Sequence, residues 1–412
     1  MLPGVDFVSA STTSLAVLGF VGGGVVLGTL SGLVPGLHAN NFALLLAAGA
    51  SSVPGPPRLV GAAILAAGVV HTFLDVVPAL ALGVPDAAMA ATALPGHRLV
   101  VAGRGREALR LSALGSGAAV LFAIPLAVPV TAAMTALYPT VRANLPLVLA
   151  AVVAFLLLTE PTRRSALGGA VAFVASAVLG ALTLDLSPAA PLDAGGMLAP
   201  LFTGLFGAPV LLDAMDGAGV PPQADARVTM TRRTLGTTAF AGSAAGAVVG
   251  YLPGISAAIA SVLALPAVPS DDGARGFLVA TSGANTANTV FALFALAALG
   301  TPRTGVMVAL DGLEGSPSLP LLLSVVAVAS TAGFVLVLLV GDRYLRVVGR
   351  MDYRLLSLAV LSLLVAVSGL FAGLVGVAVF AVATLVGLVP PRLGTRRVHL
   401  MGVLVGPLAL GL

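Results

Sequence analysis

Cysteine and lysine are absent from the sequence, and charged residues of either sign are few. Without cysteine the chain has no disulfide framework, no thiolate nucleophile and no cysteine-ligated metal. Only 9% of the 412 residues are charged and 58% are hydrophobic, whereas an average soluble domain carries roughly 25% charged residues. Such a chain cannot cover a water-exposed surface with polar groups, which excludes a soluble enzyme, a nucleic-acid-binding protein and a disordered protein.

Long apolar runs occupy most of the chain. Continuous runs predict membrane helices, because an outer-membrane barrel would show short segments of alternating hydrophobicity. A first set of runs lies near 15–34, 36–53, 59–82, 111–137, 144–159, 165–184 and 195–215. A second set lies near 236–252, 254–269, 276–299, 320–341, 355–370, 373–390 and 398–411. We therefore predict an all-α polytopic integral membrane protein with about 10–14 hydrophobic segments, including broken or re-entrant helices.

The two sets of runs are related to each other in sequence. GLVPGLHANNFALLL at 32–46 matches GYLPGISAAIASVLA at 250–264, an offset of 218. LALGVPDAAMAATALPG at 80–96 matches LAALGTPRTGVMVALDG at 296–312, an offset of 216. Two landmarks at nearly constant offset indicate an internal duplication. We expect a first transmembrane repeat over residues 1–216, a cytoplasmic linker over 217–235 and a second transmembrane repeat over 236–412.

Arginine clusters predict the orientation of the two repeats. Sixteen of the twenty arginines fall in five clusters, and the positive-inside rule places all five in the cytoplasm. The clusters lie at 98–110, 163–164, 227–233, 343–354 and 392–397. The loop at 97–110 carries four arginines but its repeat partner at 313–319 carries none, so equivalent loops lie on opposite sides of the membrane. This predicts inverted-topology repeats in the cell (plasma) membrane, with an extracytoplasmic N-terminus.

Each repeat contains one Pro-Gly pair, Pro35-Gly36 and Pro253-Gly254. Proline removes a backbone donor and glycine accepts unusual dihedral angles, so these pairs predict broken helices near the bilayer midplane. Small polar residues follow each break, namely His38, Asn40 and Asn41 in the first repeat and Ser256 in the second. On the first turn of a restarted helix they would attract an anion. Alternatively, the pairs join ordinary helices and the polar residues only cap them.

A second polar group lies on the apolar run that follows each break. His71 and Asp75 are four residues apart and share one helix face, and an ionisable group in hydrocarbon should face the bundle interior. They predict a proton relay or a cation site, or else a buried pair that orders packing. The aligned cluster of the second repeat consists of Thr281, Ser282, Asn285, Thr286, Asn288 and Thr289. This cluster could coordinate Na⁺, hydrogen-bond a carboxylate or serve interhelical packing.

A segment bounded by prolines is too short to span the membrane. Pro85 and Pro95-Gly96 enclose about ten residues, which predicts a re-entrant segment. Its counterpart begins with Pro302 and Arg303 and ends with Asp311. Arg303 is a candidate partner for an anionic substrate, because a guanidinium matches carboxylate and phosphate alike. Alternatively, it pairs with a protein carboxylate such as Asp311.

These motifs resemble those of a known family. The Pro-Gly motif at 35–36, VPDAAMAATALPGHRLVVAGRGREAL at 84–109 and PLFTGLFGAPVLL at 200–212 are similar to the large membrane subunit of tripartite tricarboxylate transporters, the TctA family. ALDG at 309–312 keeps the TALDG-like ending of that family, and PGLHANN suggests an archaeal-type branch. The resemblance implies a cation-driven carrier for citrate-like carboxylates that works with a small membrane subunit and an extracytoplasmic binding protein.

We expect a secondary-active permease for cation-coupled uptake of an organic anion such as a di- or tricarboxylate. No ATP-binding motif, cofactor, catalytic residue or metal site is expected, and Na⁺ or H⁺ is the expected coupling ion. The expected partners are the lipid bilayer, a small anionic solute and the two subunits that the resemblance implies. The first alternative is a polyprenyl-phosphate translocase of similar inverted-repeat architecture. A membrane-embedded enzyme using His71 and Asp75 is a weaker alternative, because no activated nucleophile accompanies them.

Overall fold

A computed structural model describes residues 11–35, 37, 39–83, 93–192, 196–215, 220–252, 254–268, 273–313 and 317–412. Within these ranges the regular structure is helical and no strand occurs. The first half comprises α1 (Ser11–Gly32), α2 (Ala39–Gly49), η1 (Ala50–Ser52), α3 (Pro57–Leu74), α4 (Val76–Leu82), α5 (Ala93–Val101), α6 (Gly105–Ala143), α7 (Leu145–Leu158), α8 (Arg163–Thr183), α9 (Leu198–Phe202), η3 (Thr203–Gly207) and α10 (Ala208–Ala214). The second half comprises α11 (Arg232–Tyr251), α12 (Ala257–Ala264), η4 (Leu265–Ala267), α13 (Gly273–Leu299), α14 (Gly305–Asp311), α15 (Leu319–Val348), α16 (Tyr353–Gly387), α17 (Val389–Leu393), η6 (Arg397–Met401) and α18 (Gly402–Leu410).

Seven helical segments of the described ranges are long and apolar enough to cross a membrane, judged by length and composition. They are Ser14–Gly32, Pro57–Leu82, Gly105–Ala143, Arg163–Thr183, Gly273–Leu299, Leu319–Val348 and Tyr353–Leu393. Large apolar side chains lie on their outer faces: Leu121 is 75% exposed and Leu374 is 89% exposed. Such a surface suits lipid and not water. The predicted all-α membrane class is therefore confirmed, and each predicted apolar run overlaps a helical element.

Two helices extend into segments that the sequence predicted as basic loops. α6 begins at Gly105, inside the expected loop 97–110, and α15 continues to Val348, inside the arginine cluster 343–354. The buried faces explain the extension, since Glu107 and Leu345 are buried while the neighbouring Arg346 is exposed. An apolar run stops at its first charge, whereas a helix with one buried face continues past it.

Glycines bring α1 close to α3 and α11 close to α13. A Cβ atom added to Gly24 would lie 2.2 Å from the carbonyl oxygen of Ala63 on α3, and one added to Gly28 would lie 2.3 Å from that of Ala67, one turn further along. Gly242 and Gly246, each 218 residues later, make equivalent contacts with α13. Small residues allow helix backbones to approach in this way in membranes. The shared offset is compatible with the predicted duplication, and the inversion of the repeats stays a prediction.

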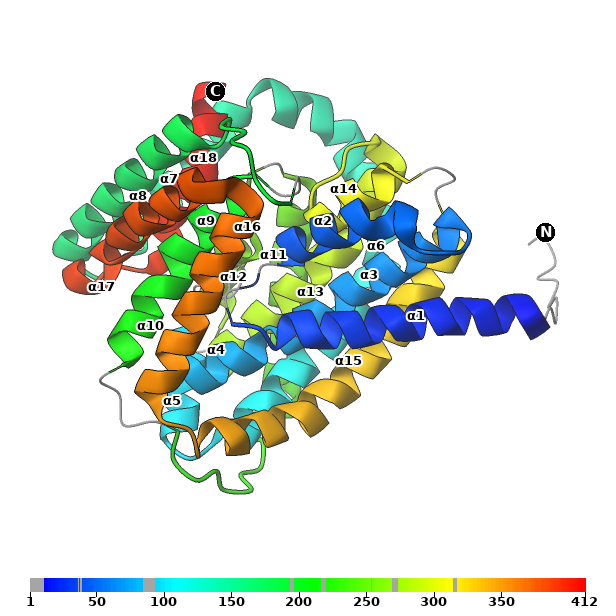
Figure 1. The fold of residues 1–412 in the computed structure, drawn as a ribbon, viewed down its shortest axis with the longest axis horizontal. Coiled ribbons are helices and arrows are strands. Elements are labelled where there is room, and N and C mark those ends of the chain that lie inside the picture. The colour runs from blue at the N-terminus through cyan, green and yellow to red at the C-terminus, as the bar shows by residue number, and fades with distance from the viewer. Residues whose placement is uncertain are drawn as a thin grey trace.

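The buried apolar side chains form two clusters. The larger cluster involves mainly α1, α3, α4, α6 and α13–α15, and the smaller involves mainly α7–α9, α12, η6 and α18. Figure 1 shows α7, α8, α17 and α18 gathered on the left and α1, α3, α13 and α15 toward the centre and right. Each cluster takes helices from both expected repeats, so the packing units differ from the predicted sequence units.

Two interruptions occur in the helices on the side of the smaller cluster. α16 contains a break at Ala372 and Gly373, which separates the predicted runs 355–370 and 373–390. Gly373 has φ 59° and ψ −155°, a conformation that is essentially restricted to glycine. The second interruption is η3, a π-helical turn between α9 and α10 that packs against α16. Such turns are frequent at functional sites.

Candidate functional site

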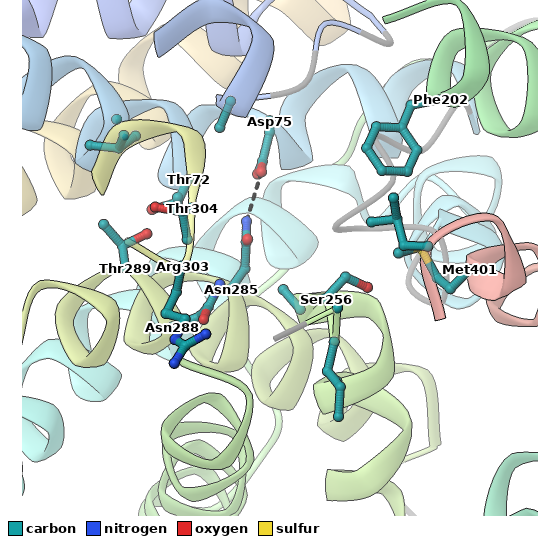
Figure 2. A pocket seen from close by; sticks show the side chains of 17 residues that line it. Thr72, Asp75, Phe202, Ser256, Asn285, Asn288, Thr289, Arg303, Thr304 and Met401 are labelled. Carbon is teal, nitrogen blue, oxygen red and sulfur yellow. Dashed lines mark hydrogen bonds between the residues drawn. The ribbon is translucent and has the colours of Figure 1, made fainter. Parts of the chain in front are cut away.

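A cavity of about 120 Å³ lies between elements of the two apolar clusters. α3, α13 and α14 line one part of it, and α9, α12, η6 and α18 line the other. Figure 2 shows Thr72 and Thr289 on one side and Phe202 and Met401 on the opposite side. One water needs roughly 10–15 Å³ by this measure, so the cavity can hold several waters or a small solute.

Asp75 lies in the cavity wall at the junction of α3 and α4. Its backbone N–H donates to the His71 carbonyl at 2.9 Å and its torsion angles are helical, so the helical path continues from α3 through Asp75 to α4. Oδ2 accepts a hydrogen bond of 2.7 Å from Nδ2 of Asn285, as Figure 2 shows. Asp75 is 3% exposed. A buried carboxylate beside an amide is an environment that suits a small cation, because both groups offer oxygen ligands.

Arg303 also lines the cavity, from the segment between α13 and α14. Its Nη2 donates to the hydroxyl of Tyr138 on α6, and its Cζ lies 5.0 Å from the centre of the Tyr138 ring. The predicted alternative was a pair with Asp311, but Asp311 is exposed and Arg303 forms no ion pair within the described ranges. Its buried Nε has no hydrogen-bond partner there either. An aromatic partner leaves the positive charge of Arg303 available to an anion.

The break before α12 opens onto the same cavity. Gly254, Ile255, Ser256 and Ala257 all line it, and Gly254 has φ +77°. Ser256 is the N-cap residue of α12 by position, but its side chain makes no capping hydrogen bond. Its buried Oγ has no partner among the described residues. The first N–H groups of a helix lack intrahelical acceptors and carry partial positive charge, so this helix start favours an anion.

The break in the first repeat is only partly described. Pro35 is buried just beyond the end of α1, and Ala39, the first residue of α2, lines the cavity. Asn40 and Asn41 lie in the first turn of α2. Three other predicted site residues, Gly36, His38 and Pro253, lie outside the described residues.

The other predicted polar residues divide between the cavity and helix packing. Asn288 and Thr289 line the cavity with Asn285, whereas Thr286 contacts Thr72 at 3.3 Å through their hydroxyls. Away from the cavity, Ser282 bonds to Ser112 of α6 at 2.8 Å, and Thr281 bonds to carbonyls of its own helix. His71 is buried outside the cavity lining, with Nδ1 2.9 Å from the hydroxyl of Ser31.

Several residues in or beside the cavity were missed from the sequence. Tyr138 is the hydrogen-bond partner of Arg303, but it lies just past the predicted apolar run 111–137, in a part of α6 that no predicted run covers. Tyrosine is rare in this chain, with four residues, and that rarity was an available signal. Phe202, Met401 and Leu404 line the cavity as ordinary apolar residues, which no local pattern distinguishes from core.

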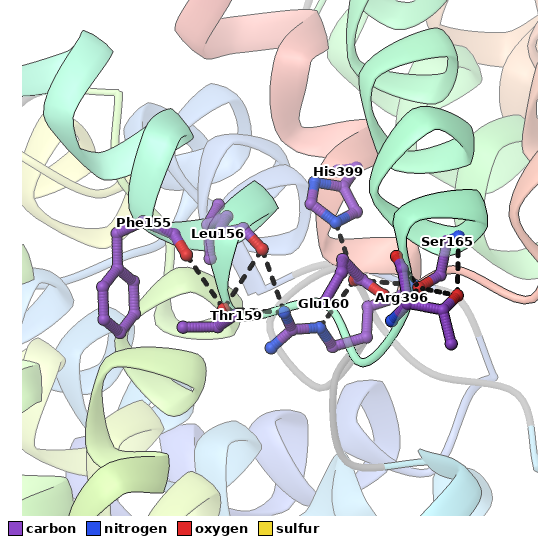
Figure 3. Close-up of polar contacts among 8 residues, drawn as sticks. Phe155, Leu156, Thr159, Glu160, Ser165, Arg396 and His399 are labelled. Carbon is purple, nitrogen blue, oxygen red and sulfur yellow. Dashed lines mark hydrogen bonds and ion pairs between the residues drawn. The ribbon is translucent and has the colours of Figure 1, made fainter.

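A second polar cluster lies at the turn between α7 and α8. Glu160, 1% exposed, accepts hydrogen bonds on Oε1 from Nε of Arg396 at 2.7 Å and from Nε2 of His399 at 2.8 Å (Figure 3). Burial raises the pKa of Glu160, but these hydrogen bonds and the charge of Arg396 outweigh burial and lower the pKa below its ordinary value. The cluster joins the α7–α8 turn to η6, the short helix that ends at Met401 in the cavity wall.

The profile of the tripartite tricarboxylate transporter TctA family matches residues 18–402. A protein of Methanocaldococcus jannaschii, described only as uncharacterized, is 32% identical over 244 residues, which are 57% of this chain and 57% of that protein. The alignment thus spans little more than half the length of that relative. No solved structure matches the chain. Because the family profile covers nearly the whole chain, this multi-pass membrane protein belongs to the tripartite tricarboxylate transporter TctA family.

Proposed function

We propose that the chain is the permease of a secondary carrier that takes up a small organic anion, a di- or tricarboxylate, together with a cation. The observation that carries the proposal is that one cavity contains both a buried acid and a guanidinium, each held by a neutral partner. Asp75 accepts from Asn285, and Arg303 donates to Tyr138. The cavity can therefore receive charges of both signs.

The anion would bind at Arg303 and at the start of α12. A guanidinium donates to a carboxylate in a planar, bidentate manner, and Nε of Arg303 is a buried donor without a partner among the described residues. Ser256 offers a hydroxyl at the start of α12. A substrate with two or three carboxylates could contact both at once.

The coupling ion, Na⁺ or H⁺, would bind at Asp75 with Asn285. An ionised Asp75 repels a second carboxylate in the same low-dielectric cavity, and a bound cation removes that repulsion. Cation and anion would therefore favour each other's binding, which is the reciprocal coupling that a symporter requires. The position of the cavity between two apolar clusters would let one packing unit move relative to the other during transport.

The family description also supports a tripartite assembly. We propose a small membrane subunit and an extracytoplasmic binding protein as partners. The proposed location is the plasma membrane, with the N-terminus outside and the arginine clusters in the cytoplasm.

The test measures binding as well as uptake, because uptake could require the partner subunits. Purified chain is titrated with labelled citrate and other di- and tricarboxylates, with and without Na⁺ and at several pH values. Arg303→Gln should weaken binding at least tenfold, since hydrogen bonds to charged groups contribute about 1.5–3 kcal/mol. Asp75→Asn should remove the cation dependence.

Asp311→Asn is the matched control, since this exposed carboxylate lies near the cavity segment but outside the cavity. It should change neither the affinity for the carboxylate nor the cation dependence of binding. If no carboxylate binds but a polyprenyl phosphate binds specifically, the carboxylate assignment is wrong and the lipid-phosphate translocase is favoured.

A further inference from the structure

Two arginine clusters, at 98–110 and 343–354, meet the segment between α10 and α11 at one end of the helix bundle. Nε of Arg106 on α6 donates to Oδ1 of Asp342 on α15 at 2.7 Å. Arg110, one turn further along α6, donates to Asp225 and to the carbonyl of Ala226, each at 2.8 Å. These bonds bring the start of α6, the end of α15 and the segment between α10 and α11 together.

Two adjoining clefts open between these segments, and Arg106 lines both. The first, of about 390 Å³, has an apolar part formed by Leu109 and Leu338 beside Arg106 and Arg110. The second, of about 330 Å³, is lined by Arg346 and Arg350. Leu345 also lines the second cleft, so the combined site is amphipathic, with leucines and arginines in both clefts.

Positive charge exceeds negative charge in the combined site. Its charged lining residues are four arginines and two aspartates, a formal charge of +2. Asp342 is shared between Nε of Arg106 and Nη2 of Arg346, so neither guanidinium is fully compensated. Within the described ranges the Nη groups of Arg106 have no partner, and the exposed Arg350 forms no ion pair.

The outer face of α15 changes from apolar to basic beside the first cleft. Val335 is 47% exposed and Leu339 is 54% exposed, whereas Arg343 and Arg346 follow within two turns. A helix that crosses a membrane makes this change at the level of the lipid headgroups. The clefts therefore lie where the phosphate of a membrane lipid would be, with the exposed face of α15 in reach of its acyl chains.

We propose that these clefts bind the headgroup phosphate of an anionic phospholipid, with an acyl chain lying against Leu338 and Leu339. Arg106, Arg346 and Arg350 contact the phosphate. The leucines beside the arginines favour a lipid over a free anion, which would gain nothing from an apolar surface. The inference is independent of the transported substrate.

Native mass spectrometry of the detergent-solubilised chain, titrated with phosphatidylglycerol or phosphatidylcholine, tests the proposal. Phosphatidylglycerol should be retained preferentially. Arg106→Gln and Arg350→Gln should each weaken its retention about fivefold, the effect expected for one arginine near an anionic lipid. Asp342→Asn should strengthen retention, because it releases Arg106 and Arg346.

Arg142→Gln is the matched control, since Arg142 is exposed at the opposite end of α6. It should leave retention unchanged. Equal retention of the two lipids, or an equal loss in Arg142→Gln, would show a diffuse charge effect and overturn the proposal. Complete displacement of phosphatidylglycerol by millimolar inorganic phosphate would assign the clefts to a free anion instead. The circular dichroism of every variant is compared with that of the original chain to confirm folding.

Discussion

Glu107→Gln should destabilise the protein more than any change at an exposed acid. Glu107 is fully buried at the start of α6. Its Oε1 accepts from Nε of Arg275 at 2.8 Å, and its Oε2 accepts from Nε of Arg104 at 2.5 Å. Thr229 adds weaker contacts of 3.3 and 3.4 Å from its hydroxyl and backbone N–H. One carboxylate therefore joins α6, α13 and the segment before α11.

The size of the effect follows from the burial of each partner. Removing one member of a fully buried ion pair costs about 3–5 kcal/mol, because the remaining charge is left without water or a counter-charge. Arg275 and Arg104 are 24% and 36% exposed, so both guanidinium groups can regain water when Glu107 loses its charge. We therefore expect a loss of about 1.5–3 kcal/mol, which corresponds to a fall in the melting midpoint of roughly 2–4 °C for a chain of this length.

Far-ultraviolet circular dichroism is the suitable assay, since the chain has neither tryptophan nor cysteine for fluorescence methods. Asp311→Asn, which changes an exposed acid, should have the same melting midpoint as the original chain. Arg275→Gln should destabilise more than Arg104→Gln because it is the more buried partner. A midpoint for Glu107→Gln within 1 °C of the original would refute the reasoning, since a buried carboxylate with two cationic partners cannot be neutralised without cost.

Three further predictions concern single positions. Gly254→Ala should lower stability by about 1–2 kcal/mol, because a left-handed φ of +77° is costly for alanine; an unchanged melting curve would contradict that backbone conformation. Tyr138→Phe keeps the ring over Arg303 but removes its hydroxyl acceptor, so the Kd for the bound anion should rise about threefold to tenfold. Tyr138→Ala removes the ring as well and should raise this Kd further. Glu160 has a lowered pKa in the folded state, so its stabilisation is present above the unfolded pKa of about 4.3 and is lost as the pH falls through the folded value. Melting curves from pH 6 to pH 3 should accordingly fall more steeply for the original chain than for Glu160→Gln, and parallel curves would contradict the role of Arg396.

Much of the fold could be predicted because hydrophobicity along the chain is its main determinant. The membrane class and the helical runs follow from the length of the apolar segments, and the break before α12 follows from proline and glycine. Helix ends were predicted less well. Arg106 and Glu107 were predicted to lie in a loop, because sequence alone does not show that α13 and α15 bury one face of this charged segment.

The sequence pointed to the polar residues of the candidate site but not to its apolar residues. Asp75, Asn285 and Arg303 stand out because polar groups are costly in hydrocarbon and rare in this chain. Phe202 and Met401 face the cavity from helices distant in sequence, and nothing local separates them from core residues. Of the two alternatives for Arg303, the pair with Asp311 was wrong, because Asp311 is exposed and the contact of Arg303 is with Tyr138 on α6. An anionic substrate at Arg303 stays a prediction.

The start of α12 has a consequence for how occupancy of the cavity could be observed. The amides of Ser256 and Ala257 begin a helix of eight residues, at the wall of an internal cavity. Beyond their own first turns, the neighbouring helices α11 and α13 have their amides in continuous hydrogen-bonded turns. Deuterium should therefore enter first at these few central amides, ahead of the helices that surround them. A ligand carboxylate that accepts from them would slow that exchange, so the broken helix would serve as an internal reporter of the loaded state.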